Sequence, residues 1–333
     1  MVVEQIGEKR FTRSVVEKSI DTLPQGEVLV KVSYSSLNYK DALSAIGNRG
    51  VTKHYPHTPG IDACGVVEES SSSDFRVGDK VIVTSYDLGM NTSGGFGQYI
   101  RVPAAWIVPL PADLDLRESM ILGTAGFTAG MSIDALTRTV APGRGDVLVT
   151  GATGGVGSLS IAILSKLGYS IVAVSGKPEA HEFLKSIGAK TIISRQDATA
   201  GYERPLLKGV WAGVIDTVGG EILAAAIKST DLQGVVTCCG NVASPELPLN
   251  VFPFILRGVS LVGIDSQNCP MEQRRRIWQK LGEEWKPEDL IKMCREVNLA
   301  ELGDEIELIL RGGQQGRVIV NLLDDSREIR VKQ

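Results

Sequence analysis

The stretch Val147-Leu148-Val149-Thr150-Gly151-Ala152-Thr153-Gly154-Gly155-Val156-Gly157 carries the pattern that decides the fold of this chain. A short β-branched run leads into closely spaced glycines, and residues 158–165 continue as an amphipathic helical pattern. Gly151 can form a tight turn, Gly154 lets the backbone approach a pyrophosphate, and Gly157 lets the helix lie close to its strand. The N–H groups of the first helical turn favour a phosphate there. The spacing G-x-x-G-x-x-G is a variant fingerprint, and alone it equally fits a glycine turn that binds nothing.

The segments after this turn decide between those two interpretations. Short apolar runs alternate with helical patterns and predict five further strands at 171–175, 191–194, 214–217, 235–238 and 261–265. Six strands with intervening helices are the number in a complete doubly wound dinucleotide-binding fold, and the glycine turn follows the first of them. The sequence therefore predicts an α/β Rossmann domain with a parallel sheet.

The first 120 residues are rich in predicted strands instead. Val28, Val30, Val32 and Tyr34 alternate with Leu29, Lys31 and Ser33, which is the period of a half-buried strand. Further short strands are expected at 61–67, 81–84 and 98–102, and a helical pattern follows from Arg117 to Val140. Short strands separated by Gly and Pro turns favour a small, partly open β-barrel.

Composition excludes several classes of function. The 333 residues carry a formal net charge of −4, and the pI of about 5.6 gives no electrostatic footprint for nucleic acid. No apolar window reaches the length of a membrane span. Five irregularly spaced cysteines fit reduced thiols, and the N-terminus lacks the layout of a signal peptide, so a cytoplasmic protein is expected.

The charges at the strand ends favour one nucleotide. NAD-preferring enzymes place Asp or Glu about 20 residues after the glycine turn, whereas this chain has Ser175-Gly176-Lys177 there. Arg195, at the end of the third strand, can reach the same pocket and pair with a 2′-phosphate. Glu179 fits helix capping better than ribose binding. NADP(H) is therefore the predicted cofactor, although Lys177 and Arg195 can also be ordinary surface charges.

Several stretches together resemble a known family. They are Ser35 to Leu43, Pro59 to Asp62, Gly123 to Ala129, Trp211 to Gly219, Pro253 to Gly258, Gly263 to Ser266 and Gln315 to Arg317. The chain resembles the zinc-free quinone-oxidoreductase branch of the medium-chain dehydrogenase/reductase superfamily, within it the YhdH/YhfP-type group that includes NADPH-dependent acryloyl-CoA reductase.

The resemblance implies a two-domain organisation. A GroES-like catalytic domain would comprise residues 1–122 and 286–333, and the Rossmann domain residues 123–285. Residues 316–322 read as a lone returning strand, in agreement with this. The resemblance also implies a homodimer that pairs through an edge of the Rossmann sheet, at residues 260–264.

No zinc site is expected. Zinc-dependent relatives have a Cys ligand in the stretch where this chain reads Asn38-Tyr39-Lys40-Asp41, and a His-Glu pair where it reads Ile61-Asp62. The five cysteines contain no C-x-x-C, and the three histidines form no ligand pattern with them. Cys238 and Cys239 fit an apolar strand as buried structural residues.

Without a metal, reduction of an activated C=C is more natural than alcohol oxidation. An enolate that develops during such a reduction needs a hydrogen-bond donor and a proton. Tyr39 is the candidate acid or donor, and the resemblance places it beside the nicotinamide. Asn38 would orient the carboxamide or substrate and Asp41 would position Tyr39, Lys40 or a water, although both can simply cap a helix that begins near Lys40. Tyr39 can likewise be a packing residue.

The remaining cofactor contacts are implied by the resemblance alone. Thr153, Gly154, Gly155, Val156 and Gly157 would hold the pyrophosphate. Asn241, Ile255 and Ser266 would lie on the nicotinamide side. Arg317 would reach the cofactor or an acidic substrate group, unless it is a solvated arginine at a strand end. Arg49, Lys53 and Arg257 are basic residues that could hold CoA phosphates.

Three functions stay open at this point. The first is an NADPH-dependent reductase of an enoyl thioester or enone, with acryloyl-CoA as the substrate that the resemblance implies. The second is an NADPH:quinone oxidoreductase. The third, of another class, is a non-catalytic NADPH-binding protein. In each case the expected partners are small molecules, with no nucleic acid and no membrane.

Overall fold

The computed structural model describes residues 1–323 and contains two compact units. Of the described residues, the first unit comprises 1–123, 294–313 and 317–323, and the second comprises 124–293 and 314–316. The compact units divide after residues 123 and 293. The predicted domain division, with boundaries after residues 122 and 285, stays a prediction. The part of the predicted catalytic domain at 324–333 lies outside the described residues.

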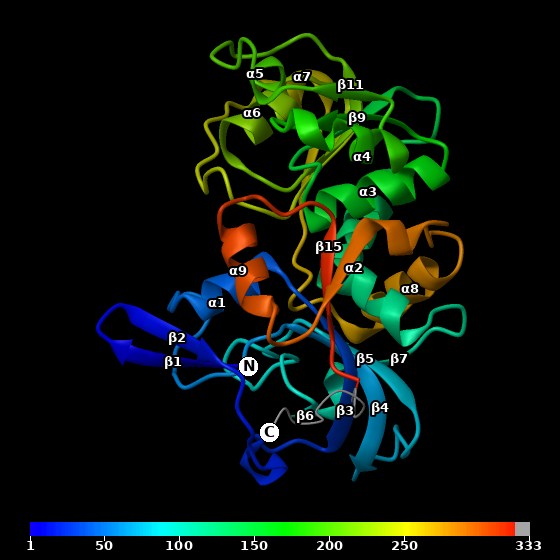
Figure 1. Cartoon of the computed structure of the whole chain (residues 1–333). Coiled ribbons are helices and arrows are strands. Elements are labelled where there is room, and N and C mark those ends of the chain that lie inside the picture. The colour runs from blue at the N-terminus through cyan, green and yellow to red at the C-terminus, as the bar shows by residue number, and fades with distance from the viewer. Residues whose placement is uncertain (324–333) are drawn as a thin grey trace. The chain divides into compact units, whose positions relative to one another are not determined.

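The first unit is built on one curved, mostly antiparallel sheet. Its strand order is β14-β15-β3-β4-β5-β7, with β6 also pairing with β3. The strands are β3 (Val28–Ser36), β4 (Asp62–Ser70), β5 (Lys80–Thr84), β6 (Tyr99–Val102), β7 (Ile107–Pro109), β14 (Cys294–Val297) and β15 (Arg317–Asn321). The returning strand β15 pairs antiparallel with β3, and Figure 1 shows it in red beside the blue strand. Val28, Val30 and Val32 lie in the core of this unit as expected. Leu29 and Ser33 are buried as well, so the prediction of a half-buried strand is wrong for β3, which is covered on both faces except at Lys31 and Tyr34.

Several elements of the first unit have no counterpart in the sequence prediction. A hairpin of β1 (Val2–Gly7) and β2 (Arg10–Ser14) forms a separate two-stranded sheet, and β7 and β14 add short strands. Helix α1 (Tyr39–Ala45), in contrast, begins where a helix was expected, near Lys40, and α9 (Leu302–Leu310) precedes the returning strand β15.

The second unit confirms the Rossmann prediction. Six parallel strands lie in the order β10-β9-β8-β11-β12-β13. They are β8 (Asp146–Val149), β9 (Ser170–Val174), β10 (Thr191–Ile193), β11 (Trp211–Asp216), β12 (Thr230–Cys238) and β13 (Ser260–Gly263). The chain adds strands on one side of β8 and then on the other, so the order reverses between β8 and β11. Ligands of such sheets bind beyond the carboxyl ends of the strands at this point.

Helices follow each of these strands. They are α3 (Gly155–Lys166), α4 (His181–Ser186), α5 (Arg195–Ala198), α6 (Gly220–Lys228), α7 (Phe252–Arg257) and α8 (Met271–Gly282). The last of them, α8, comes after β13 and so connects no two strands of the sheet. None of the helices in residues 1–323 is both long and apolar enough to span a bilayer.

The predicted helix at 117–140 is interrupted. Helical structure extends over α2 (Leu116–Thr137), but Gly123 has φ 51° and ψ −155° and breaks it into two parts. This backbone conformation is accessible to glycine almost exclusively, and the N-terminal segment of the first unit ends at this residue. The periodicity of the sequence continues through the break, which is why it predicts one helix.

Candidate functional site

The glycine turn of the second unit has the geometry of a phosphate cradle. Gly154 is the N-cap of α3, with φ −77° and ψ 172°, and no side chain caps that helix. A Cβ on Gly157 would lie 2.4 Å from the carbonyl oxygen of Gly151, so the helix can approach the turn only with glycine there. A Cβ on Gly154 would have Gly151 O at 3.4 Å as its sole close neighbour, and that side of the turn is therefore open. The uncapped N–H groups at the start of α3 can hold a phosphate.

The carboxyl edge of the sheet also carries the predicted 2′-phosphate residues. Ser175 directly follows β9, and its hydroxyl accepts a hydrogen bond from the Lys177 backbone N–H at 3.1 Å. Lys177 is half-buried, and its ammonium lies 3.4 Å from the carbonyl oxygen of Gln314. Arg195 begins α5 and lies against Gly176, where a Cβ would be 3.3 Å from its Nε. Burial lowers the pKa of Lys177; the Glu179 carboxylate opposes this change, and the nearby Arg195 guanidinium adds to it. Two cations that repel each other at a strand edge favour an anion beside them.

Residues 314–316 attach to this part of the second unit. The Gly316 N–H donates to the carbonyl oxygen of Thr153 at 2.9 Å, within the glycine turn. The tripeptide therefore connects the turn to Lys177 through backbone groups. Sequence reasoning missed this contribution because the residues lie more than 130 positions from Lys177.

The other predicted cofactor residues of the second unit lie at separate places. Asn241 is exposed after β12, and Ser266 follows β13, where its hydroxyl lies 2.9 Å from the Thr128 hydroxyl. Both are therefore at the carboxyl edge. Ile255 is on α7 and is 68% exposed. Contacts of Asn241, Ile255 and Ser266 with the nicotinamide therefore stay predictions.

In the first unit, Tyr39 is the first residue of α1 and is 37% exposed. Its hydroxyl makes no hydrogen bond to the described residues of its own unit, whereas the residues around it are firmly held. The exposed phenol can therefore act on a ligand, and its acid role stays a prediction.

Asp41 caps α1 from a fully buried position. Its Oδ2 accepts the Asn38 N–H at 2.8 Å, and its Oδ1 accepts the N–H groups of Gly60 at 3.1 Å and Ile61 at 2.8 Å. Burial, and then the neighbouring Asp62 carboxylate, raise the pKa of Asp41 to about 7, whereas the hydrogen bonds from the backbone N–H groups of Asn38 and Ile61 favour its charged form. The capping interpretation of Asp41 is thus what its contacts show.

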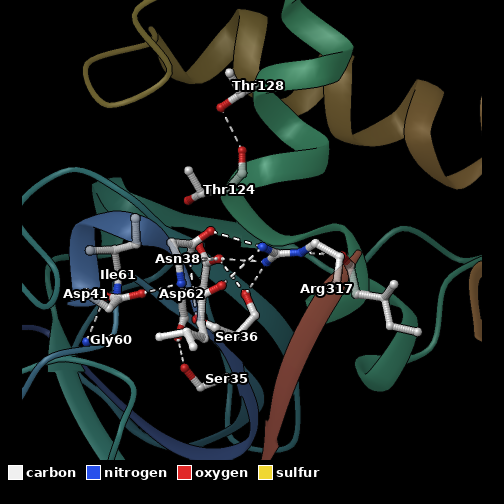
Figure 2. A network of polar contacts seen from close by, with 12 residues as sticks. Ser35, Ser36, Asn38, Asp41, Gly60, Ile61, Asp62, Thr124, Thr128 and Arg317 are labelled. Carbon is white, nitrogen blue, oxygen red and sulfur yellow. Dashed lines mark hydrogen bonds and ion pairs between the residues drawn. The ribbon is translucent and has the colours of Figure 1, made fainter. Parts of the chain in front are cut away.

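The Asn38 side chain joins two charged groups (Figure 2). Its Nδ2 donates to Asp62 Oδ2 at 2.8 Å, and its Oδ1 accepts from Arg317 Nη1 at 3.3 Å. Ser36 bridges the same two groups, because its hydroxyl donates to Asp62 at 2.6 Å and accepts from Arg317 at 2.8 Å. Because the amide is engaged at both ends, its orientation is fixed within this unit.

Arg317 is the cation of this network. It is 2% exposed, and its Nε and Nη1 also donate to the carbonyl oxygens of Ile121 and Leu37 at 2.9 and 3.2 Å. Its Nη2 lies 3.8 Å from Asp62 Oδ2, which forms a buried ion pair. These contacts hold the Arg317 guanidinium within its own unit. A direct contact between Arg317 and the cofactor or substrate stays a prediction. Asp62 and Ser36 were missed as site residues, although both lie in stretches that carry the family resemblance.

Two of the basic residues considered for CoA phosphates also have protein partners. Arg257 donates to the carbonyl oxygens of Lys228, Thr230 and Leu207. Arg49 donates to Gln5 Oε1 and to the carbonyl oxygen of Lys53, and stacks on the Tyr55 ring. Within residues 1–323, no group of three or more His, Cys, Asp or Glu side chains is arranged to hold a metal ion.

Comparisons with known families match both units. Residues 24–112 match the alcohol dehydrogenase GroES-like domain, and residues 155–283 match a family described as zinc-binding dehydrogenase.

Three relatives match over nearly the whole chain. YhfP of Bacillus subtilis, provisionally named a quinone oxidoreductase, is 45% identical over 93% of this chain and 95% of its own. The acrylyl-CoA reductase AcuI of Ruegeria pomeroyi is 43% identical over 97% of this chain and 98% of its own. The crystal structure of the yhdH oxidoreductase from Salmonella enterica with NADP has a TM-score of 0.93 and 41% identity, covering 96% of this chain and 98% of that one.

The structure of YhfP, determined with NAD bound, has a TM-score of 0.94 and 43% identity, and covers 96% of this chain and 98% of that one. Both structural matches extend over nearly the whole chain and include both compact units. The chain belongs to the medium-chain dehydrogenase/reductase family of oxidoreductases.

Proposed function

We propose that this protein is an NADPH-dependent reductase of an activated C=C, with acryloyl-CoA or a similar enoyl thioester as substrate. The observation that carries the substrate is the similarity to an acrylyl-CoA reductase, which extends over 97% of this chain at 43% identity.

Features of the second unit support NADP(H) as the cofactor. The uncapped start of α3 and the open side of Gly154 fit a pyrophosphate. Lys177 and Arg195 fit a 2′-phosphate, because guanidinium and ammonium groups make charge-assisted hydrogen bonds to phosphate oxygens. Arg195 also lines a cavity of about 520 Å³ with Thr199, Glu221 and Ser244, which we assign to the adenosine end. A relative's structure with NADP supports the same cofactor, and that of YhfP with NAD makes the preference worth measuring.

Bound NADPH would supply a hydride to the β-carbon of the substrate. The residues of this chain then have to stabilise charge on the thioester oxygen and bring a proton to the α-carbon. We assign the donor role to the exposed Tyr39 hydroxyl. Asp41 holds the first turn of the helix that carries Tyr39, and Asn38 precedes Tyr39 in a fixed orientation.

Quinone reduction is the second candidate, supported by the 45% identity to YhfP with its provisional name. A quinone oxygen can take its proton from water, so this reaction would depend less on Tyr39. A non-catalytic NADPH-binding protein is the candidate of another class.

One assay separates these candidates. NADPH oxidation is followed in parallel with acryloyl-CoA, crotonyl-CoA and a small quinone. Turnover with acryloyl-CoA at least tenfold above that with the quinone is expected. Turnover with quinone alone would establish the second candidate, and tight NADPH binding without turnover of any of the three would favour the third.

The proposed assembly is a homodimer formed through β13. Within the described residues β13 pairs only with β12, and Leu261 on it is 37% exposed. A monomeric mass in solution by light scattering would contradict this proposal. The cytoplasmic location also stays a prediction, based on the five free cysteines.

A further inference from the structure

A fully buried carboxylate lies at the beginning of β4. Asp62 has no exposed surface, and its Oδ2 accepts hydrogen bonds from Ser36 at 2.6 Å and Asn38 at 2.8 Å. Its countercharge is Arg317, whose Nη2 lies 3.8 Å away. Taking both charges out of water is costly, and a protein with apolar residues of similar volume in their place is often equally stable. The pair is therefore poorly explained by stability alone.

The contacts of this pair converge on the residue before Tyr39. The Asn38 amide is held between Asp62 and Arg317, and its backbone N–H is held by Asp41. Arg317 also donates to the carbonyl oxygen of Leu37 at 3.2 Å. The carbonyl group of Leu37 and the backbone N–H and side-chain amide of Asn38, just before α1, are thus all held by hydrogen bonds; Figure 2 shows those of Asn38.

Gly123 packs directly against the side chains of Asp62, Ser36 and Arg317. A Cβ at this position would lie 2.5 Å from Asp62 Oδ2, 2.6 Å from Ser36 Oγ and 2.9 Å from Arg317 Nη2. The backbone at Gly123 therefore lies so close to the ion pair that any residue with a side chain would clash with it. Exclusion of water strengthens each of these charged hydrogen bonds.

We propose that the Asp62–Arg317 ion pair positions Tyr39, by fixing Asn38 and thereby the first turn of α1. Asp62, Ser36 and Arg317 are positioning residues in this scheme. The ion pair fixes the backbone that leads into α1. The position of this backbone in turn determines where the exposed Tyr39 phenol points. This inference rests on the proposed function only where turnover is the readout.

The test uses Asp62→Asn, which keeps the shape of the side chain but removes the ion-pair partner of the buried Arg317 guanidinium. Glu69→Gln is the matched control, since it removes an exposed ion pair with Arg101 at 3.2 Å from the same strand. If Asp62→Asn does not fold, Asp62→Asn with Arg317→Gln, which is neutral at both positions, takes its place.

The first readout is a double-mutant cycle on kcat with acryloyl-CoA. Asp62→Asn should lower kcat by about 10–100-fold, because displacement of a catalytic group by about 1 Å has an effect of this size. NADPH affinity should stay within about twofold. In a Tyr39→Phe background the same change should have almost no further effect, because the two residues act through one group. Independent, additive losses would overturn the proposal.

The second readout is hydrogen exchange of the peptide that covers α1, which does not depend on the reaction. Asp62→Asn should accelerate exchange in residues 39–45 at least tenfold, while residues 80–84 of β5 and the Glu69→Gln protein stay unchanged. Unchanged exchange in α1 would overturn the proposal. If Tyr39→Phe proves fully active, Tyr39 is not the acid. The exchange measurement alone then decides whether the Asp62–Arg317 ion pair fixes α1.

Discussion

Replacement of Gly154 by alanine should weaken cofactor binding without weakening the fold. Gly154 has ordinary backbone angles, and the added Cβ would meet only Gly151 O, at 3.4 Å, which is van der Waals contact. Alanine is a poorer N-cap than glycine by somewhat under 1 kcal/mol, but it gains about 0.4–1 kcal/mol from the smaller entropy of its unfolded chain. These contributions nearly cancel, so the Tm should move by less than about 2 °C.

The methyl group would instead occupy the space that a pyrophosphate needs. Overpacking by one methyl group costs roughly 1–3 kcal/mol, and the dissociation constant should therefore rise about 5–150-fold. The increase should be equal for NADPH and NADH, because both contain the pyrophosphate. Fluorescence titration with each cofactor measures it.

Gly157→Ala is the informative contrast. Its Cβ would lie 2.4 Å from Gly151 O and 2.9 Å from Ala152 Cα, both of which are backbone atoms that cannot rotate away. This variant should lose both stability and affinity, with a Tm lower by several degrees. Gly168→Ala has open space around its Cβ but a φ of 80°, so it shows the effect of backbone strain alone. If Gly154→Ala binds both cofactors like the wild type, the pyrophosphate does not lie at this turn.

The remaining predictions concern the cofactor, the acid, the metal and pH. The double variant Lys177→Ala with Arg195→Ala should bind NADPH at least tenfold more weakly, since hydrogen bonds to charged groups contribute roughly 1.5–3 kcal/mol each. Its affinity for NADH should be unchanged. Equal losses of affinity for both cofactors by titration would refute the assignment of these residues to the 2′-phosphate. Tyr39→Phe should lower kcat for an enoyl thioester about 10²–10⁴-fold with NADPH affinity intact, and a change confined to KM would mean that Tyr39 only binds substrate. Prolonged chelation should leave turnover unchanged, and stoichiometric zinc lost together with activity would contradict this expectation. Because the pKa of Asp41 is raised to about 7 in the folded chain, the folded state binds this proton more tightly than the unfolded one. Its contribution to the free energy of unfolding should therefore be largest below about pH 4, decrease as pH rises to about 7 and stay constant above; urea unfolding from pH 5 to 8 should show this decrease in the wild type relative to Asp41→Asn.

The sequence alone determined the parts of this protein that depend on local patterns. Short apolar runs, the glycine spacing and the helical periods predicted all six strands of the second unit and their doubly wound arrangement. Ser175, Lys177 and Arg195 could be assigned to one sheet edge, because the ends of parallel strands always face the same way. The hairpin β1–β2 was missed because β2 is mostly polar and the apolar residues of β1, Val2, Val3 and Ile6, do not alternate with polar ones, which leaves little hydrophobic period to detect.

Only the tertiary structure decided which polar residues act together in the first unit. Asp62 lies 24 positions from Asn38, and Arg317 lies 279 positions from it, so no local pattern relates them. The sequence left Arg317 open between a cofactor contact and a solvated strand end, and it offered no reason to single out Asp62. Folding buried both charges, and a buried carboxylate requires a countercharge and hydrogen-bond donors. The strand pairing of β15 with β3 brings Arg317 to the Ser36–Asn38 turn, where it meets that requirement.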